Sequence, residues 1–115
     1  MAIPKLPFAK VRRIDNTVYL AGELGFNDDG SIPEGIEAQT RRCIERIQAT
    51  LEAEGLTLKS TISLSCILTD VEDFGAFNKV FAEYFNGDVL PVRTTYQSGL
   101  MLEGAKLEIT TIAEA

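Results

Sequence analysis

Two amphipathic helical patterns separated by β-prone runs constrain the fold of this chain most strongly. In residues 34–54, apolar side chains recur at three- and four-residue spacing, and Gly55 is placed to end the helix. We expect a second helix to begin at Asp70 or at Glu72-Asp73, where carboxylates are favourable. Its apolar stripe is aromatic, and this spacing favours a face packed on a sheet over a cofactor-binding cluster. The stripe consists of Phe74, Phe77, Phe81, Tyr84 and Phe85.

Runs of β-forming residues flank both helical patterns. Residues 9–14 and 17–21 are predicted to pair as a hairpin, because Asp15 and Asn16 between them both tolerate positive φ. Further strands are expected over residues 61–68, from about residue 92 onward, and from residue 106 to about residue 113. In residues 61–68, alternation predicts a single apolar side and a small, more polar side. The apolar side comprises Ile62, Leu64, Cys66 and Leu68, and the other comprises Ser63, Ser65 and Ile67.

The resulting order is β-β-α-β-α-β-β, which predicts one α+β domain over residues 1–115. Each helix that lies between strands can act as a crossover, with both helices on one face of a mixed sheet. A chain of 115 residues offers no third layer for the other face. We therefore expect self-association to cover that face.

Composition excludes several kinds of chemistry. The chain has no histidine, so a histidine-based triad, a histidine general base and a histidine-containing zinc site are ruled out. The two cysteines, Cys43 and Cys66, lie on apolar faces and are expected to be reduced core residues, which favours a cytoplasmic protein. The net charge of −6 is unfavourable for binding nucleic acid, and no apolar run is long enough to predict a membrane span. Neither a metal nor an organic cofactor is expected.

Two charged residues of the C-terminal strands are candidates for chemistry. Arg93 directly follows a Pro-Val pair, and its planar guanidinium can hold a carboxylate through two parallel hydrogen bonds. Glu108 alternates with Leu107 and Ile109, so it points away from the core toward solvent or another subunit. Spacing alone also allows both to be ordinary solvated charges. The mixed charges on the first helix are typical of a solvated face, and we assign them no chemistry.

Five segments of the sequence form a recognisable series. They are Tyr19–Gly22, Asp28–Gly30 with Gln39, Thr69–Phe74 with Asn78 and Tyr84-Phe85, Pro91–Thr95, and Lys106–Ile109. In this order they resemble the Rid/YjgF family of reactive-intermediate deaminases, which act on enamines and imines. The Pro-x-Arg strand followed by the Lys-Leu-Glu-Ile strand resembles the C-terminal signature of that family.

The resemblance implies a homotrimer with a chorismate-mutase-like fold and clefts between subunits. It further implies that Arg93 binds the carboxylate of a small imine such as 2-iminopropanoate, the tautomer of 2-aminoacrylate. Glu108 corresponds to the acid/base residue that orients water, and hydrolysis gives a 2-keto acid and ammonia. The remaining substrate-binding positions implied by the resemblance are Thr95, Phe8, Ala21, Gly22 and Asn78.

Several of these positions depart from well-studied members. Phe8, Ala21 and Thr95 stand where tyrosine, serine and cysteine are common, and Glu23 stands where glutamine is common. A larger imine, such as the ring-cleavage product 2-aminomuconate, is therefore an alternative substrate. Further alternatives are a non-enzymatic trimer that senses a small metabolite or acts as a chaperone and, less favoured, an endoribonuclease.

Overall fold

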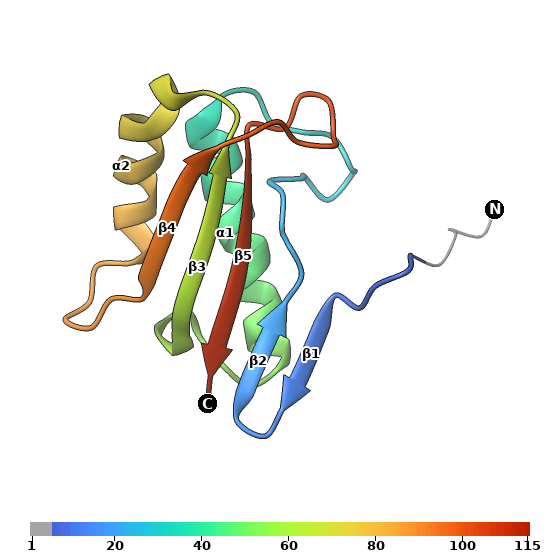
Figure 1. Ribbon diagram of the computed structural model, residues 1–115, viewed down its shortest axis with the longest axis vertical. Coiled ribbons are helices and arrows are strands. Elements are labelled where there is room, and N and C mark those ends of the chain that lie inside the picture. The colour runs from blue at the N-terminus through green and yellow to red at the C-terminus, as the bar shows by residue number, and fades with distance from the viewer. Residues whose placement is uncertain (1–5) are drawn as a thin grey trace.

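The computed structural model of the protein describes residues 6–115 and contains one mixed sheet with two long helices (Figure 1). The order expected from the sequence is confirmed. The strands and helices are β1 (Val11–Ile14), β2 (Thr17–Leu20), α1 (Ile36–Ala53), β3 (Thr61–Leu68), α2 (Phe74–Tyr84), β4 (Val92–Gln97) and β5 (Leu107–Glu114). Short 3-10 turns, η1 (Leu58–Ser60) and η2 (Val71–Asp73), precede β3 and α2.

The strand order in the sheet is β1-β2-β5-β3-β4. β3 and β4 are parallel, because α2 crosses over between them, and every other neighbouring pair is antiparallel. The last strand of the chain therefore lies in the middle of the sheet, between β2 and β3. β4 forms one edge of the sheet, and both helices lie on the same face (Figure 1).

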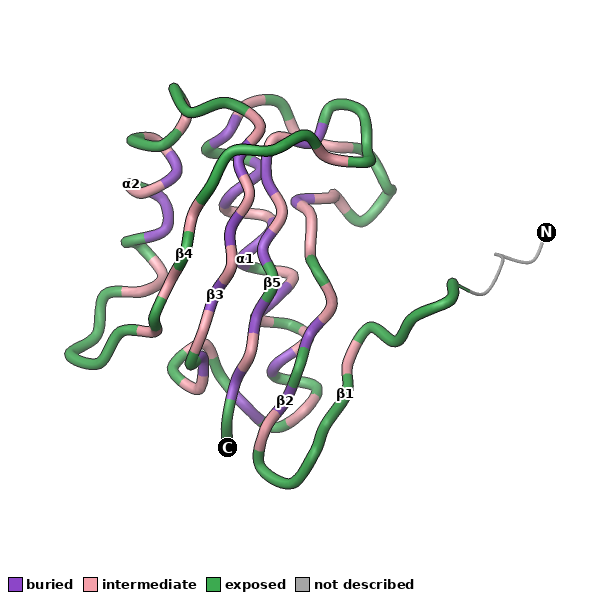
Figure 2. The backbone as a smooth tube through the Cα atoms, viewed as in Figure 1, coloured by how far each residue is buried: buried purple, intermediate pink, exposed green. Residues whose placement is uncertain are grey.

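The core lies between this face and the helices. Leu64, Cys66 and Leu68 on β3 and Leu107 and Ile109 on β5 all point toward the helices and are buried. They join helix residues such as Ile44, Ile47 and Leu51 in one cluster. Figure 2 shows buried and partly buried positions alternating along β3 and β5, as expected for a sheet with one covered face. Within residues 6–115, neither helix is long and apolar enough to cross a membrane.

The structure contains the turn predicted between β1 and β2 and the glycine predicted to end α1. Asp15 adopts φ 52° between β1 and β2, which agrees with the two-residue hairpin predicted there. Gly55 adopts φ 77° and donates its N–H to Glu52 O at 3.0 Å, so it ends α1 as expected. Cys43 and Cys66 are buried free thiols, which confirms the prediction of reduced core cysteines.

Two predictions about side-chain placement were wrong. Ile62 was expected on the apolar side of β3, but it is 49% exposed and Thr61 takes the inward position. The cause is a register shift between Thr61 and Ser63 in the pairing with β5, which reverses the alternation at the start of the strand.

The aromatic stripe of α2 is buried only in part. Phe77 and Phe81 are in the core, whereas Phe74 at the start of the helix is 45% exposed. Asp70 caps η2 rather than α2, because its side chain accepts the N–H of Glu72 at 2.9 Å and the α-helix begins only at Phe74. Of the two predicted starts of the helix, Asp70 was wrong and Glu72-Asp73 is confirmed, because Asp73 is the N-cap of α2.

We expect Phe81→Ala to lower the free energy of unfolding by about 3–5 kcal/mol, because it removes a buried aromatic ring. Phe74→Ala, the matched exposed position of the same helix, should cost less than about 1 kcal/mol. Denaturant titration of both variants measures the difference. Equal losses would contradict the assignment of the two rings to core and surface.

Candidate functional site between α2 and β4, and on the open face of the sheet

The guanidinium of Arg93 lies against a group of aromatic rings. Arg93 pairs in register with Leu64 across the parallel β3–β4 ladder, so its side chain points to the helix-covered face. Its Cζ atom lies 4.7 Å from the ring centroid of Phe81, 5.2 Å from that of Phe77 and 5.8 Å from that of Phe74. Ring faces attract a cation at such distances, so α2 holds the guanidinium in place.

Arg93 is only partly buried, and among residues 6–115 no carboxylate or other hydrogen-bond acceptor binds its guanidinium. The rings leave the edges of the planar group free, and these edges carry its N–H donors. A positive charge that is fixed in position and lacks an acceptor is suited to a carboxylate ligand, which can take two of these donors at once.

Two unpaired side-chain oxygens lie on the same side of the sheet as Arg93. The Oδ1 atom of Asn78 on α2 and the Oγ1 atom of Thr95 on β4 are buried, and neither has a hydrogen-bond partner in the described part of the chain. Buried polar atoms are nearly always satisfied, so each such oxygen requires an explanation, and a bound ligand would provide one. Asn78 and Arg93 line one cavity of about 360 Å³ together with Phe81, Leu90 and Pro91.

Glu108 lies on the opposite, open face of the sheet. It pairs in register with Ile67, which in turn pairs with Tyr96, and the three side chains form one row across β5, β3 and β4. The carboxylate of Glu108 reaches toward the segment that follows β2, where a Cβ atom built on Gly22 would lie 2.8 Å from its Cδ atom. Gly22 thus leaves the room that this carboxylate occupies.

The backbone around Glu108 is fixed on both sides. Glu23 exchanges two hydrogen bonds with Ile109, at 2.8 and 3.0 Å. The buried amide of Gln39 on α1 accepts the N–H of Lys106 at 2.8 Å and donates to Gly104 O at 3.1 Å. These bonds fix the entry to β5, and a rigid strand is what a precisely placed acid/base group requires.

The structure therefore divides the predicted site residues into two groups on opposite faces. Arg93, Thr95 and Asn78 lie on the helix side near β4, and Gly22 lies with Glu108 on the open face. Ala21 is partly buried beside Gly22. Phe8 is 62% exposed, and it lies in an N-terminal segment that leads away from the sheet (Figure 1). Arg93 and Glu108 of one chain cannot contact the same small molecule, because the sheet separates them.

A buried thiol lies on β3 beside the strand that carries Arg93 and Thr95. Cys66 pairs in register with Thr95, and burial raises the pKa of its thiol to about 11, although the positive charge of Arg93 partly opposes this shift. Burial also raises the pKa of Cys43 well above its usual value. A nucleophilic cysteine requires a lowered pKa, so neither thiol is suited to that role.

The aromatic rings were the functional feature that sequence reasoning missed. Periodicity identified Phe77 and Phe81 as core residues, but it gave no sign that they also contact Arg93. The available signal was the parallel crossover itself, because β3-α2-β4 places one helix directly over the strand that follows it. The row of Glu108, Ile67 and Tyr96 was missed because it depends on the register of three paired strands, which no single strand reveals.

Comparison with known proteins identifies the family. The family model described as Endoribonuclease L-PSP matches residues 2–115. The chain belongs to this family, which is also known as the Rid/YjgF family.

Curated and structural relatives agree with this assignment. The chain is 28% identical over 109 residues to the 2-iminobutanoate/2-iminopropanoate deaminase of Mus musculus, covering 93% of this chain and 80% of that protein. RidA from an Antarctic Psychrobacter species superimposes with a TM-score of 0.90 at 30% identity, covering 98% and 92% of the two chains. TdcF of E. coli, solved with bound serine, gives a TM-score of 0.89 at 27% identity, covering 99% and 91%.

We predict that Gly22→Ala displaces the Glu108 carboxylate but leaves the fold intact. The new methyl group meets the end of a flexible side chain, which can swing away, so the free energy of unfolding should change by less than about 1 kcal/mol. Gly25→Ala provides the contrast, because its Cβ atom would lie 2.2 Å from the backbone oxygen of Gln39, which cannot move alone. That variant should lose about 2–3 kcal/mol.

Denaturant titration and a crystal structure of the Gly22→Ala variant measure these two effects. An unmoved Glu108 carboxylate in that crystal structure would show that the contact with Gly22 is not as described.

Proposed function

We propose that the protein hydrolyses small imines and enamines that carry a carboxylate, of the 2-iminopropanoate and 2-aminoacrylate type, to 2-keto acids and ammonia. The observation that carries this proposal is the guanidinium of Arg93, which is held against aromatic rings without an acidic partner in the described chain. Family membership supports the reaction type, because a curated relative is named as an imine deaminase.

The substrate carboxylate would bind Arg93 through two parallel hydrogen bonds. Such charge-assisted pairs are short and directional, so they would fix the imine carbon relative to the protein. The amide of Asn78 and the hydroxyl of Thr95 lie on the same side of the sheet and would contact the bound molecule. The relative TdcF binds serine, a small molecule that carries a carboxylate, which supports a ligand of this size.

Glu108 would move the proton during hydrolysis. Its carboxylate accepts a proton from water as the water oxygen bonds to the imine carbon, and it returns that proton to the nitrogen. The resulting carbinolamine expels ammonia and leaves the keto group. Because imines hydrolyse unaided in water, positioning and a general acid–base contribution of about 10²–10⁴-fold are sufficient. No step requires a metal or an organic cofactor.

The complete site would form between subunits, since the sheet separates Arg93 from Glu108 in one chain. The open face is suited to contact with another copy, because it carries small side chains such as Ser65 and Thr94, and because Val92 and Tyr96 on it are 68% and 48% exposed. β4 is an edge strand, so Arg93 of one subunit can approach Glu108 of a neighbouring subunit. We propose a homotrimer, the assembly implied by the family resemblance.

The substrate and the location can be proposed more narrowly. Thr95, Ala21 and Phe8 lack the thiol and hydroxyl groups common at these positions, so a pathway-specific substrate such as 2-aminomuconate is a narrower alternative. The net charge of −6 weakens attraction to a polyanion, so we favour a small imine over RNA as the substrate. The buried free thiols agree with a reducing compartment, and a cytoplasmic location stays a prediction.

Arg93→Ala should lower kcat/KM for imine hydrolysis by about 10²-fold or more, because charge-assisted hydrogen bonds contribute about 1.5–3 kcal/mol each. Arg93→Lys should recover only part of the loss, because an ammonium group cannot bind a carboxylate through two parallel bonds. Glu108→Gln should keep KM near that of the wild type while kcat falls. The assay generates imines in situ with an amino-acid oxidase and follows keto-acid release.

Arg12→Ala, which removes an exposed arginine on β1, is the matched control and should leave the rate unchanged. Full activity of Arg93→Ala would refute the proposed mechanism. If the wild type is inactive on every carboxylate-bearing imine, a metabolite-binding or chaperone-like trimer becomes the better explanation.

Mixed oligomers test whether the site lies between subunits. Light scattering should show a trimer at micromolar concentration. Inactive Arg93→Ala and Glu108→Ala chains, refolded together, should recover about a quarter of wild-type activity, because random mixing restores both groups at that share of cyclic interfaces. Each variant refolded alone is the control. A monomer, or mixed oligomers without activity, would show that Arg93 and Glu108 of different chains do not share a site.

A further inference from the structure

A further cavity lies along α1, away from Arg93 and Glu108. It has a volume of about 520 Å³, which is within the range of small-molecule sites. Its walls come from Lys10 and Val11 at the start of β1 and from one side of α1 between Arg42 and Glu54. We call this cavity the α1 groove. Val11, Ala49 and Ala53 contribute apolar surface to it.

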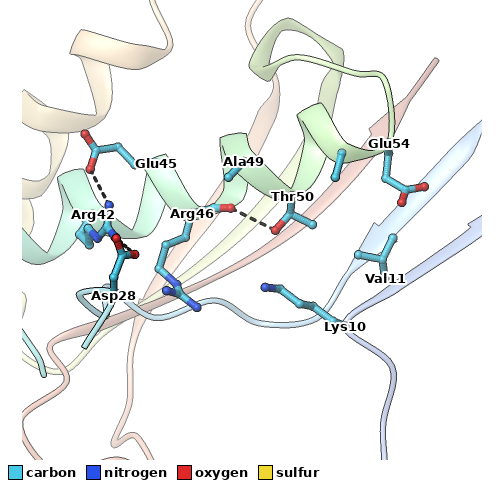
Figure 3. Close-up of a pocket in the computed structure, with 10 residues that line it drawn as sticks. Lys10, Val11, Asp28, Arg42, Glu45, Arg46, Ala49, Thr50 and Glu54 are labelled. Carbon is cyan, nitrogen blue, oxygen red and sulfur yellow. Dashed lines mark hydrogen bonds and ion pairs between the residues drawn. The ribbon is translucent and has the colours of Figure 1, made fainter. Parts of the chain in front are cut away.

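Two cations face each other in the middle of the α1 groove. Figure 3 shows the guanidinium of Arg46 and the ammonium group of Lys10 pointing toward each other from opposite walls. Among the residues that the structure describes, no acidic group pairs with Lys10. Like charges that face each other repel, and an anion between them removes that repulsion.

The acidic residues of the groove are occupied elsewhere. Asp28 and Glu45 both bind Arg42 at one end of the groove. Glu54 lies at the other end, and its nearest cation is Arg13 at 4.0 Å. Figure 3 shows Arg46 and Lys10 between these two ends. At the centre of the groove, Lys10 has no acidic partner among the described residues, and Arg46 has one, Glu23, which binds only its Nε atom.

Arg46 is held in position before any ligand arrives. Its Nε atom donates to Glu23 Oε1 at 2.9 Å, and its Cζ atom lies 5.8 Å from the centroid of the Phe26 ring. The carboxylate of Glu23 is only 13% exposed, and its backbone is paired with Ile109, so the anchor is rigid. Both Nη groups have no acceptor within residues 6–115. The opposite wall is fixed too, because Ala21 N–H donates to Lys10 O at 2.9 Å.

We propose that the α1 groove is a second ligand site, distinct from the Arg93 group, which binds a compact organic anion. Its carboxylate or phosphate group would lie between Arg46 and Lys10, where both cations can donate hydrogen bonds to it. A short apolar body would lie against Val11, Ala49 and Ala53. This site lies between α1 and the start of β1 within one subunit, so it is independent of the proposed imine hydrolysis.

NMR titration of the full-length protein with butyrate, acetate and inorganic phosphate tests this site. Butyrate should shift the backbone amides of Lys10, Thr50 and Ala53, with a Kd in the millimolar range. Each methylene that becomes buried tightens binding about fourfold, so butyrate should bind several times more tightly than acetate. Stronger shifts with phosphate than with either carboxylate would identify a phosphate-bearing ligand as the class that the groove accepts.

Three variants localise the effect. Lys10→Gln changes an exposed side chain and should weaken butyrate binding at these amides about tenfold without affecting folding. Arg46→Gln should abolish binding. This substitution also removes the partner of Glu23 and can destabilise the protein, and in that case the result for Lys10→Gln decides whether the groove binds the anion. Arg12→Gln, the matched charge removal on β1, should change the Kd less than twofold.

Arg93→Ala should leave the shifts at Lys10, Thr50 and Ala53 in place, because that residue belongs to the other site. The proposal is overturned if the groove amides do not respond to any of the three anions. It is also overturned if Arg12→Gln weakens binding as much as Lys10→Gln, since a general charge effect would then explain the attraction.

Discussion

The position of β5 between β2 and β3 is the constraint on which the rest of the structure depends. This strand contributes to both faces of the sheet at once. Leu107 and Ile109 complete the core beneath the helices, whereas Glu108 between them emerges on the open face. The alternation of one strand thus couples the stability of the domain to the placement of the candidate acid/base group.

The surroundings of β5 hold it at defined points. The Gln39 amide on α1 fixes the loop that leads into the strand, and Glu23 pairs with the strand at Ile109. Glu23 also binds Arg46, so a single residue links the central strand to the α1 groove. Its neighbour Gly22 leaves the space into which the Glu108 carboxylate extends. Substitutions in this short segment therefore affect both sites.

The opposite-face placement of Arg93 and Glu108 gives a physical reason for self-association. A monomer would present each group alone: a fixed cation without an acid on one side, and a carboxylate on an uncovered face on the other. Joining the β4 edge of one chain to the open face of another would bring the two groups together and cover exposed residues such as Val92 and Tyr96. In the proposed homotrimer, assembly would complete the proposed site.

The sequence by itself determined the order of the elements, the C-terminal end of α1, the hairpin turn at Asp15 and the opposite orientations of Leu107 and Glu108. Each of these depends on local periodicity or on the backbone freedom of one residue, and both can be read along the chain. Arg93 and Glu108 were also identified from sequence, through family resemblance rather than through spacing. Ile62 was misplaced because a register shift is a property of two paired strands and leaves no mark on the alternation of one. Only the tertiary structure decided that the rings of α2 hold Arg93, that the sheet separates it from Glu108, and that Arg46 faces Lys10. These facts depend on contacts between segments far apart in the chain, and they follow from how the elements pack rather than from what each element is.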